Sequence, residues 1–174
     1  MKNLVIIVII LAVTSSASAE TQWEAYLAVP TPENAVHVKK IEYTPGAIPE
    51  KYGYWAPDLE ILRDQVLGGD QESFRLAYRL RKVSDGGLLE ELTIILSHVI
   101  RARPEFFLNE MSALNPSKAA LDDILLMPGL EYTDRDKARQ YEIKMRHKAL
   151  ASVQNQNLRK FRDMCLGIIG QGNM

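Results

Sequence analysis

The chain has 174 residues, of which 47% are hydrophobic and 25% are charged, and its formal net charge is −1. This composition is typical of a globular protein with a hydrophobic core, and it excludes an intrinsically disordered polymer. The near balance of 21 basic and 22 acidic residues argues against nucleic acid as the main partner, because nucleic-acid-binding proteins carry a basic excess.

Residues 1–19 have the three regions of a bacterial-type secretory signal peptide. Lys2 supplies the positive charge, Leu4–Val13 is an apolar run, and small residues follow it. The run spans ten residues, whereas a helix needs ~20 to cross a bilayer. An Ala-x-Ala cleavage site ends at Ala19. We therefore expect a mature protein that begins at Glu20, is periplasmic or extracellular, and has no stable membrane anchor.

The expected mature chain divides into an arm, residues 20–57, and a helical domain, residues 58–174. The arm contains five of the eight prolines, a density that prevents a long helix. We expect it to be extended, with a short helical turn at Trp23–Ala28. Alternation of apolar and polar residues at Val36–Val38 and Ile41–Tyr43 is compatible with a strand.

Helical patterns fill the rest of the chain and predict an all-α fold. We expect a single bundle of about five to seven helices, with stacked helix pairs as the variant architecture. Prolines at first helical positions, glycine pairs at helix ends and Asp70 as an N-cap mark the helix bounds. The predicted helices are 58–67, 71–83, 87–101, 104–113 and 116–126, followed by a long helical pattern from residue 134 that breaks near 154–157.

The segment 87–101 is predicted to be the central helix. At 100° per residue its aliphatic side chains form two adjacent stripes that cover more than a third of the circumference. So wide an apolar surface is typical of a helix packed on several sides. In the preceding helix, Arg81 falls within the apolar arc, so its charge must reach solvent, interact with the helix C-terminus or find a partner.

The charge is distributed unevenly along the mature chain. Residues 20–133 hold 11 basic and 18 acidic side chains, a net charge of −7, whereas residues 134–174 hold nine and four, a net charge of +5. The basic tail is expected either to dock on its own body or to face an acidic partner.

In the tail, the pattern predicts a narrow buried stripe of Ala138, Tyr141, Met145 and Ala149, flanked by basic side chains. Three of the flanking residues are our candidate binding residues: Arg139, Lys144 and Arg146. A second predicted stripe consists of Leu158, Phe161, Cys165 and Ile168. Cys165 is the only cysteine, so it forms no intramolecular disulfide, and its apolar neighbours predict a buried, inert thiol.

The aromatic cluster Tyr52, Tyr54 and Trp55 is the most unusual local feature of the mature chain. Exposed aromatic rings can stack on sugars or anchor a protein interface, and we include these three among the candidate binding residues. The other interpretation is a hydrophobic latch that holds the arm on the helical body.

No constellation in the sequence predicts catalysis. The three histidines, His37, His98 and His147, lack the spacing of a zinc motif, and no phosphate-binding loop or nucleophile elbow occurs. The adjacent acidic pairs, such as Glu90 and Glu91, point about 100° apart on a helix, whereas the two carboxyls of a glycosidase face each other. We therefore assign no catalytic residue, no metal ligand and no cofactor.

These observations favour an exported, non-enzymatic protein that acts by binding another protein, as inhibitors, immunity proteins and adaptors do. Unequal charge and an aromatic cluster, without a catalytic motif, are the reasons. The alternative hypothesis is a cell-wall glycan-binding module or cell-wall hydrolase that uses Tyr52, Tyr54 and Trp55 together with acidic side chains.

Overall fold

The computed structural model describes residues 22–38, 57–127, 129 and 135–171. Within these ranges the chain forms α-helices and one short 3₁₀-helix and no strand, which confirms the all-α prediction. The predicted signal peptide and the aromatic cluster Tyr52, Tyr54 and Trp55 lie outside the described residues.

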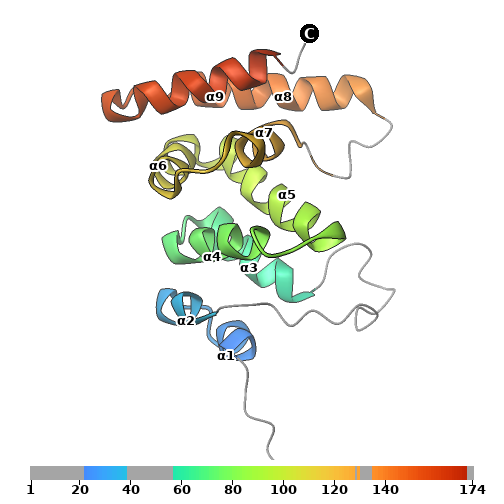
Figure 1. Cartoon of the computed structure of the whole chain (residues 1–174), viewed down its shortest axis with the longest axis vertical. Coiled ribbons are helices and arrows are strands. Elements are labelled where there is room, and N and C mark those ends of the chain that lie inside the picture. The colour runs from blue at the N-terminus through green and yellow to red at the C-terminus, as the bar shows by residue number, and fades with distance from the viewer. Residues whose placement is uncertain (1–21, 39–56, 128, 130–134, 172–174) are drawn as a thin grey trace, which may run out of the picture.

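The helices are stacked in layers along the long axis of the molecule (Figure 1). In chain order they are α1 (Gln22–Ala28), α2 (Pro32–His37), α3 (Pro57–Gly68), α4 (Gln71–Arg81), α5 (Gly86–Ala102), α6 (Pro104–Leu114), α7 (Lys118–Leu126), α8 (Asp136–Ala151), the 3₁₀-helix η3 (Gln156–Leu158) and α9 (Arg159–Gln171). The α1–α2 pair lies at one end, α3 and α4 come next, then α6 and α7, and the α8–α9 pair lies at the other end. These layers form an all-α bundle in which α6 and α7 share a layer but pack on α5 and α9 and hardly on each other.

Helix α5 is central, as its sequence predicts. It runs obliquely between the layers and contacts α3, α4, α6, α7 and α8 (Figure 1). All residues from Leu92 to Ser97 are buried, as are Val99 and Ile100. A helix in contact with five others needs apolar side chains on most of its circumference, and that requirement accounts for the two stripes in its sequence.

Of the predicted arm, residues 22–38 are described. They form α1, where the sequence predicts a short helical turn, and α2, where the sequence predicts an extended chain and the alternation at Val36–Val38 is compatible with a strand. Pro32 is the first residue of α2, a position that requires no amide donor. The side chain of Thr31 caps the helix by accepting a hydrogen bond from the Asn34 amide at 3.3 Å. The Thr-Pro pair is typical of a helix start, but the high proline content of the arm led to the prediction of an extended chain.

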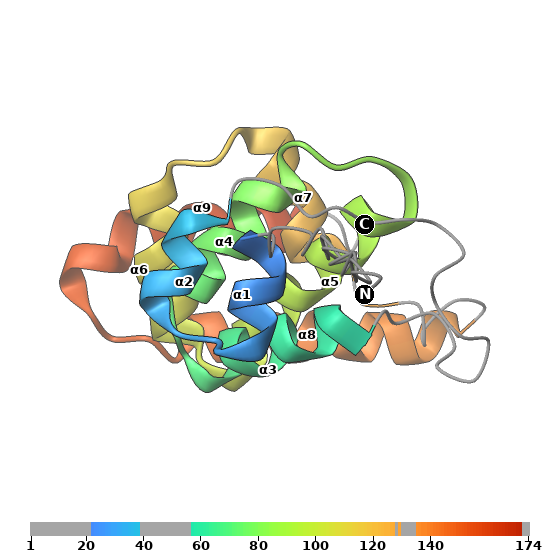
Figure 2. The ribbon, with the colours of Figure 1, turned by 90° about the horizontal axis from the view of Figure 1, so that it is seen from below.

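The α1–α2 pair is joined to α4 by hydrogen bonds and contributes two buried aromatic side chains to the core. The rings of Trp23 and Tyr26 are stacked with centroids 5.4 Å apart, and both side chains are buried. The Tyr26 hydroxyl is 3.0 Å from Ser73 Oγ on α4. Seen along the stack, α1 and α2 lie in front of the other layers (Figure 2).

Polar side chains also connect the inner layers. Glu110 of α6 is almost completely buried, and its carboxylate accepts hydrogen bonds from Arg75 Nε at 2.9 Å and Gln71 Nε2 at 2.8 Å on α4. Arg81 of α4 donates to Thr93 Oγ1 of α5 and to Asp123 Oδ2 of α7, each at 2.8 Å. The charge of Arg81 is therefore compensated by Asp123 on α7, and Thr93 on α5 accepts a further hydrogen bond from it.

The predicted helix bounds agree with the structure to within about two residues. The largest differences at a helix start are two residues: α7 begins at Lys118 and not at Pro116, and α8 begins at Asp136 and not at residue 134. Ser117 is its N-cap and accepts a hydrogen bond from the Ala120 amide at 3.2 Å. Asp70 caps α4 as predicted, accepting from the Ser73 amide at 2.7 Å. The predicted break in the tail is occupied by η3.

The turn between α3 and α4 depends on Gly69, whose φ is +91°. A Cβ atom built there would lie 3.1 Å from Nη1 of Arg103, and Arg103 Nε donates to the Leu67 carbonyl at 2.9 Å. The positive φ therefore favours glycine at this position, and a Cβ would also displace the guanidinium by a few tenths of an ångström. Gly68, the preceding residue, has open space around the position of a Cβ and ends α3.

We predict that Gly69→Ala lowers the free energy of unfolding by about 1–2 kcal/mol, because alanine is strained at positive φ and crowds Arg103. Gly68→Ala, its neighbour and matched control, should be neutral or stabilising by up to about 1 kcal/mol, because alanine favours the helix. Urea denaturation of the two variants measures the difference. Equal midpoints would contradict the role given to Gly69.

Candidate functional site

Helix α8 carries the candidate binding residues predicted on the tail, and its inner face anchors it to the body. The buried residues of α8 are Glu142, Ile143, Arg146 and Leu150. Ile143 and Leu150 belong to the hydrophobic core, whereas Glu142 and Arg146 make polar contacts. The tail is thus docked on its own body, one of the two arrangements expected from its charge.

Arg146 has no exposed surface, and its guanidinium joins three helices. Nη1 donates to the carbonyls of Met127 at 2.8 Å and Leu125 at 3.2 Å, at the end of α7 where carbonyls lack partners within the helix. Nη2 donates to Ser97 Oγ on α5 at 3.1 Å, and Nε donates to Glu142 Oε1 at 3.2 Å. The prediction of Arg146 as a surface binding residue is therefore wrong.

Glu142 completes this buried cluster. Its second oxygen, Oε2, accepts from Arg101 Nη1 of α5 at 2.6 Å. Burial of an ionised carboxylate is unfavourable unless positive groups pair with it, and here two guanidinium groups do so. The predicted stripe is correct only in part, because Ala138, Met145 and Ala149 are half-buried whereas Tyr141 is 61% exposed. The buried face of α8 contains Glu142 and Arg146 in addition to apolar side chains.

The outer face of α8 consists of Lys137, Tyr141, Lys144 and Lys148, all exposed, and we call these four residues the lysine face. Their intervals of four, three and four residues place them within an arc of about 60°. Lys137 and Arg146 are nine residues apart, so the lysine face points away from the buried cluster. Of the two remaining candidates on α8, Lys144 belongs to this face.

Arg139 lies about 140° around the helix from Lys144, so the two candidates are not on one face. Arg139 is nevertheless exposed, and none of residues 135–141 is buried. The N-terminal part of α8 extends beyond the layers next to it (Figure 2). Arg139 is therefore accessible because it lies on this projecting part.

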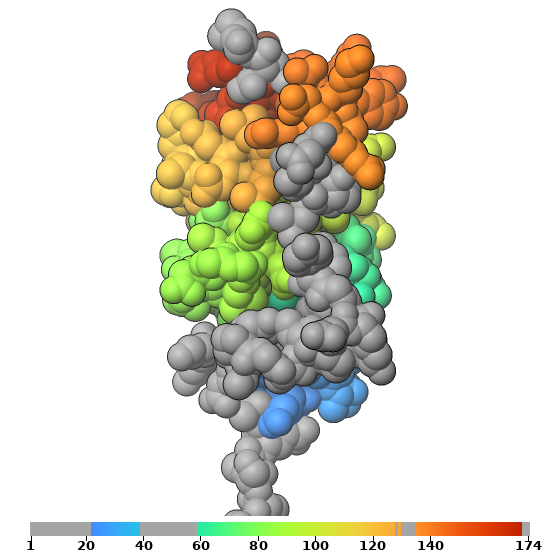
Figure 3. Space-filling model, turned by 90° about the vertical axis from the view of Figure 1, so that its right-hand side faces the viewer, coloured from blue at the N-terminus to red at the C-terminus, as the bar shows by residue number. Residues whose placement is uncertain are grey.

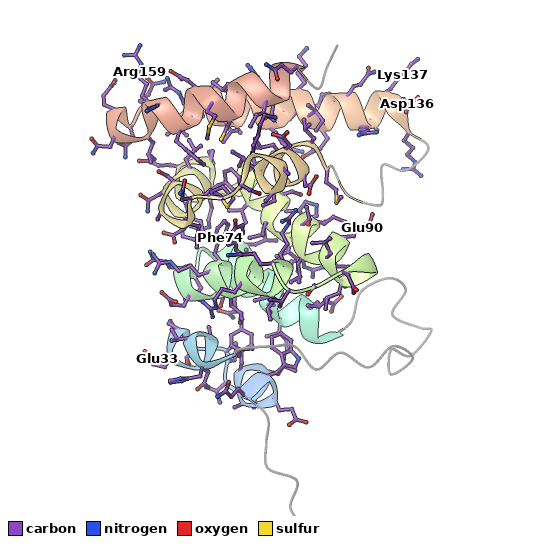
Figure 4. The ribbon with its side chains drawn as sticks, viewed as in Figure 1. Glu33, Phe74, Glu90, Asp136, Lys137 and Arg159 are labelled. Carbon is purple, nitrogen blue, oxygen red and sulfur yellow. The ribbon has the colours of Figure 1, made fainter. Side chains whose placement is uncertain are left out.

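The lysine face lies on the terminal layer of the stack. Helices α8 and α9 lie side by side at that end of the molecule (Figure 3). Lys137 of α8 and Arg159 of α9 point away from the body (Figure 4). No helix of the described ranges packs on this outer side of the layer.

The three lysines of this face lack acidic partners among the residues that the structure describes. On α9, in contrast, Arg159 and Arg162 both approach Asp163, at 3.8 Å and 2.8 Å. Lys144 and Lys148 are four residues apart, a spacing at which like charges destabilise a helix by about 0.2–0.5 kcal/mol. The lysine face therefore lowers the stability of α8.

Other chemistry is sparse in the described ranges. No group of three or more His, Cys, Asp or Glu side chains there is arranged to hold a metal ion. None of the helices described is both long and apolar enough to span a bilayer. His147 is exposed on α8, and Tyr52, Tyr54 and Trp55 lie outside the described residues.

Cys165 is buried on the inner face of α9, as its neighbours in the sequence predict. Burial raises the pKa of its thiol to about 12, so almost none of it is the nucleophilic thiolate at neutral pH.

Comparison of the chain with known protein families, with curated proteins and with solved structures finds no match. Function is therefore inferred from the chemistry of the described residues. Sequence reasoning identified Lys144 but missed the rest of the lysine face, Lys137, Tyr141 and Lys148. The intervals of four, three and four residues between these side chains were the available signal.

We predict that Arg146→Ala lowers the free energy of unfolding by about 3–5 kcal/mol, because it leaves buried carbonyls and part of the Glu142 charge without a partner. Arg139→Ala, on an exposed position of the same helix, should change it by less than about 0.5 kcal/mol. Chemical denaturation followed by circular dichroism compares the two. Similar losses in both variants would show that the Arg146 cluster does not anchor α8.

We predict that Cys165 in the folded protein reacts with a thiol reagent at pH 8 more than about a hundredfold more slowly than in the unfolded chain, because burial restricts access and suppresses the thiolate. Stopped-flow labelling with and without denaturant measures the ratio. Rapid labelling of the native protein would instead indicate an accessible, activated thiol.

Proposed function

We propose that the protein is an exported, non-enzymatic binding protein that holds an acidic surface of another protein against α8. Its mode of action would be that of an inhibitor, immunity or adaptor protein. The observation that carries the proposal is the lysine face: Lys137, Lys144 and Lys148, without acidic partners in the described ranges, around the exposed ring of Tyr141.

The energetics of α8 support a binding role. Like charges on one helix face reduce the stability of the helix, and no described residue compensates them. A basic patch of this kind accelerates association with an acidic partner and selects against basic ones. An acidic partner would also remove the repulsion within the face.

Tyr141 supplies the apolar contact that charge alone does not give. Aromatic side chains are enriched among the residues that dominate protein interfaces, because a large ring becomes buried with little loss of conformational freedom. Tyr141 is the only aromatic residue of α8, and it lies between Lys137 and Lys144 on the lysine face.

The inner face of α8 makes the surface rigid. Arg146 and Glu142 fix the helix to α5 and α7 through hydrogen bonds that are buried or partly buried. A preorganised helix loses little conformational entropy when it binds, and more of the contact energy is retained as affinity.

A photoreactive amino acid at position 144, in the protein expressed in its native envelope, should form a cross-link to one discrete protein. The same substitution at position 82, an exposed lysine at the end of α4, should not. Lys137→Glu/Lys148→Glu should reduce the cross-link at position 144 at least tenfold, because it reverses the charge of the face. Mass spectrometry identifies the adduct.

Absence of any protein adduct at position 144, together with retention of the protein on isolated cell wall, would overturn this proposal. That outcome would favour the glycan-binding alternative.

A further inference from the structure

Resting on the proposed function, we infer that the occupant of the lysine face is an acidic α-helix of the partner protein, lying along α8. Three properties of α8 carry this inference: the register of its exposed side chains, the shape of the surface that they form, and the location of its apolar residues.

The register of the lysine face places its four side chains on one stripe of α8, along which a partner helix can lie. Lys137, Tyr141, Lys144 and Lys148 follow one another at intervals of four, three and four residues, the spacing with which a helix repeatedly faces a helical partner. The four residues extend over about 16 Å of helix axis, or three turns. A partner helix with the same repeat would meet each of them in succession.

The chemistry of the four positions specifies what the partner helix presents. Each lysine requires a carboxylate within reach of its ammonium group, so the facing positions are Glu or Asp. Tyr141 interrupts the lysines once, and the residue that faces its ring is aliphatic. The aliphatic stems of the lysines cover the flanks of that contact, while their charged ends reach outward.

The shape of this end of the molecule also allows a partner helix to lie along α8. None of residues 135–141 is buried, and the N-terminal part of α8 projects beyond the adjacent layers (Figure 2). The lysine face is therefore exposed along this part of α8. Arg139 is also exposed on this projecting part, but it lies on nearly the opposite side of the helix and does not belong to the lysine face.

A lipid surface fits these residues less well. A helix that lies in a membrane interface needs an apolar face to insert beneath the headgroups. In α8 the large aliphatic side chains, Ile143 and Leu150, are buried in the body of the protein, and Tyr141 is the one large apolar side chain on the outer face.

The test uses a synthetic helical peptide with Glu at the positions that face the three lysines and Leu at the one that faces Tyr141. An isomeric peptide of equal helicity, with the same residues distributed around the helix, is its control. Fluorescence anisotropy at 150 mM salt should show at least tenfold tighter binding of the patterned peptide. Vesicles of anionic phosphatidylglycerol test the lipid surface in parallel.

Two protein variants locate the binding. Lys137→Glu/Lys144→Glu/Lys148→Glu should weaken binding of the patterned peptide at least tenfold, whereas Lys82→Glu/Arg159→Glu/Lys160→Glu, with the same change of charge at exposed positions, should weaken it less than threefold. Tyr141→Ala should weaken it three- to tenfold. Thermal melts of all variants verify that each is folded.

Equal binding of the two peptides, or vesicle binding that depends on the lysine face while the patterned peptide stays unbound, would overturn the inference. This result is distinguishable from failure of the proposed function. If position 144 still cross-links to a protein in the envelope, the binding function stands and only its helical occupant is wrong.

Discussion

Burial of arginine between helix layers is the interaction on which the rest of this structure depends. Arg81 crosses from α4 to Asp123 on α7, and Arg79 donates to the Ala35 carbonyl of α2 at 2.8 Å. Arg146 is the extreme case, because its whole side chain is buried and its donors reach α5 and α7. The guanidinium of Arg146 satisfies buried carbonyls that would otherwise lose their hydration without compensation. Removal of the arginine would leave those groups unpaired, so these contacts fix how adjacent layers are positioned.

This way of joining layers has a consequence for the surface. Where basic and acidic side chains of the inner helices are turned inward, they compensate one another, as Glu110 and Glu142 show. A terminal layer has a neighbour on one side only. The basic side chains on the outer side of α8, Lys137, Lys144 and Lys148, therefore lack such partners within the described ranges. The proposed acidic helix would act on α8 as a further layer of the stack.

The sequence predicted most of the fold and part of the candidate site. The helix bounds and the central position of α5 were accessible because prolines, glycines, caps and wide apolar stripes are local signals. Lys144 was identified correctly as an exposed basic residue. Arg146 and Tyr141 were misassigned, because an amphipathic pattern equates apolar with buried. On α8 the inner face includes a paired acid and base, and an aromatic ring lies on the outside.

What the sequence determined by itself is therefore the all-α class, the position of most helices and the burial of Cys165, since each follows from residues close together in the chain. Only the tertiary structure decided which face of α8 is buried. Arg146 can be buried because Ser97, Glu142 and the carbonyls at the end of α7 converge on it, and most of these groups are at least 19 residues away in sequence. A local sequence pattern cannot show such a convergence. Because Arg146 is buried, the opposite side of α8, which carries the lysine face, is on the outside.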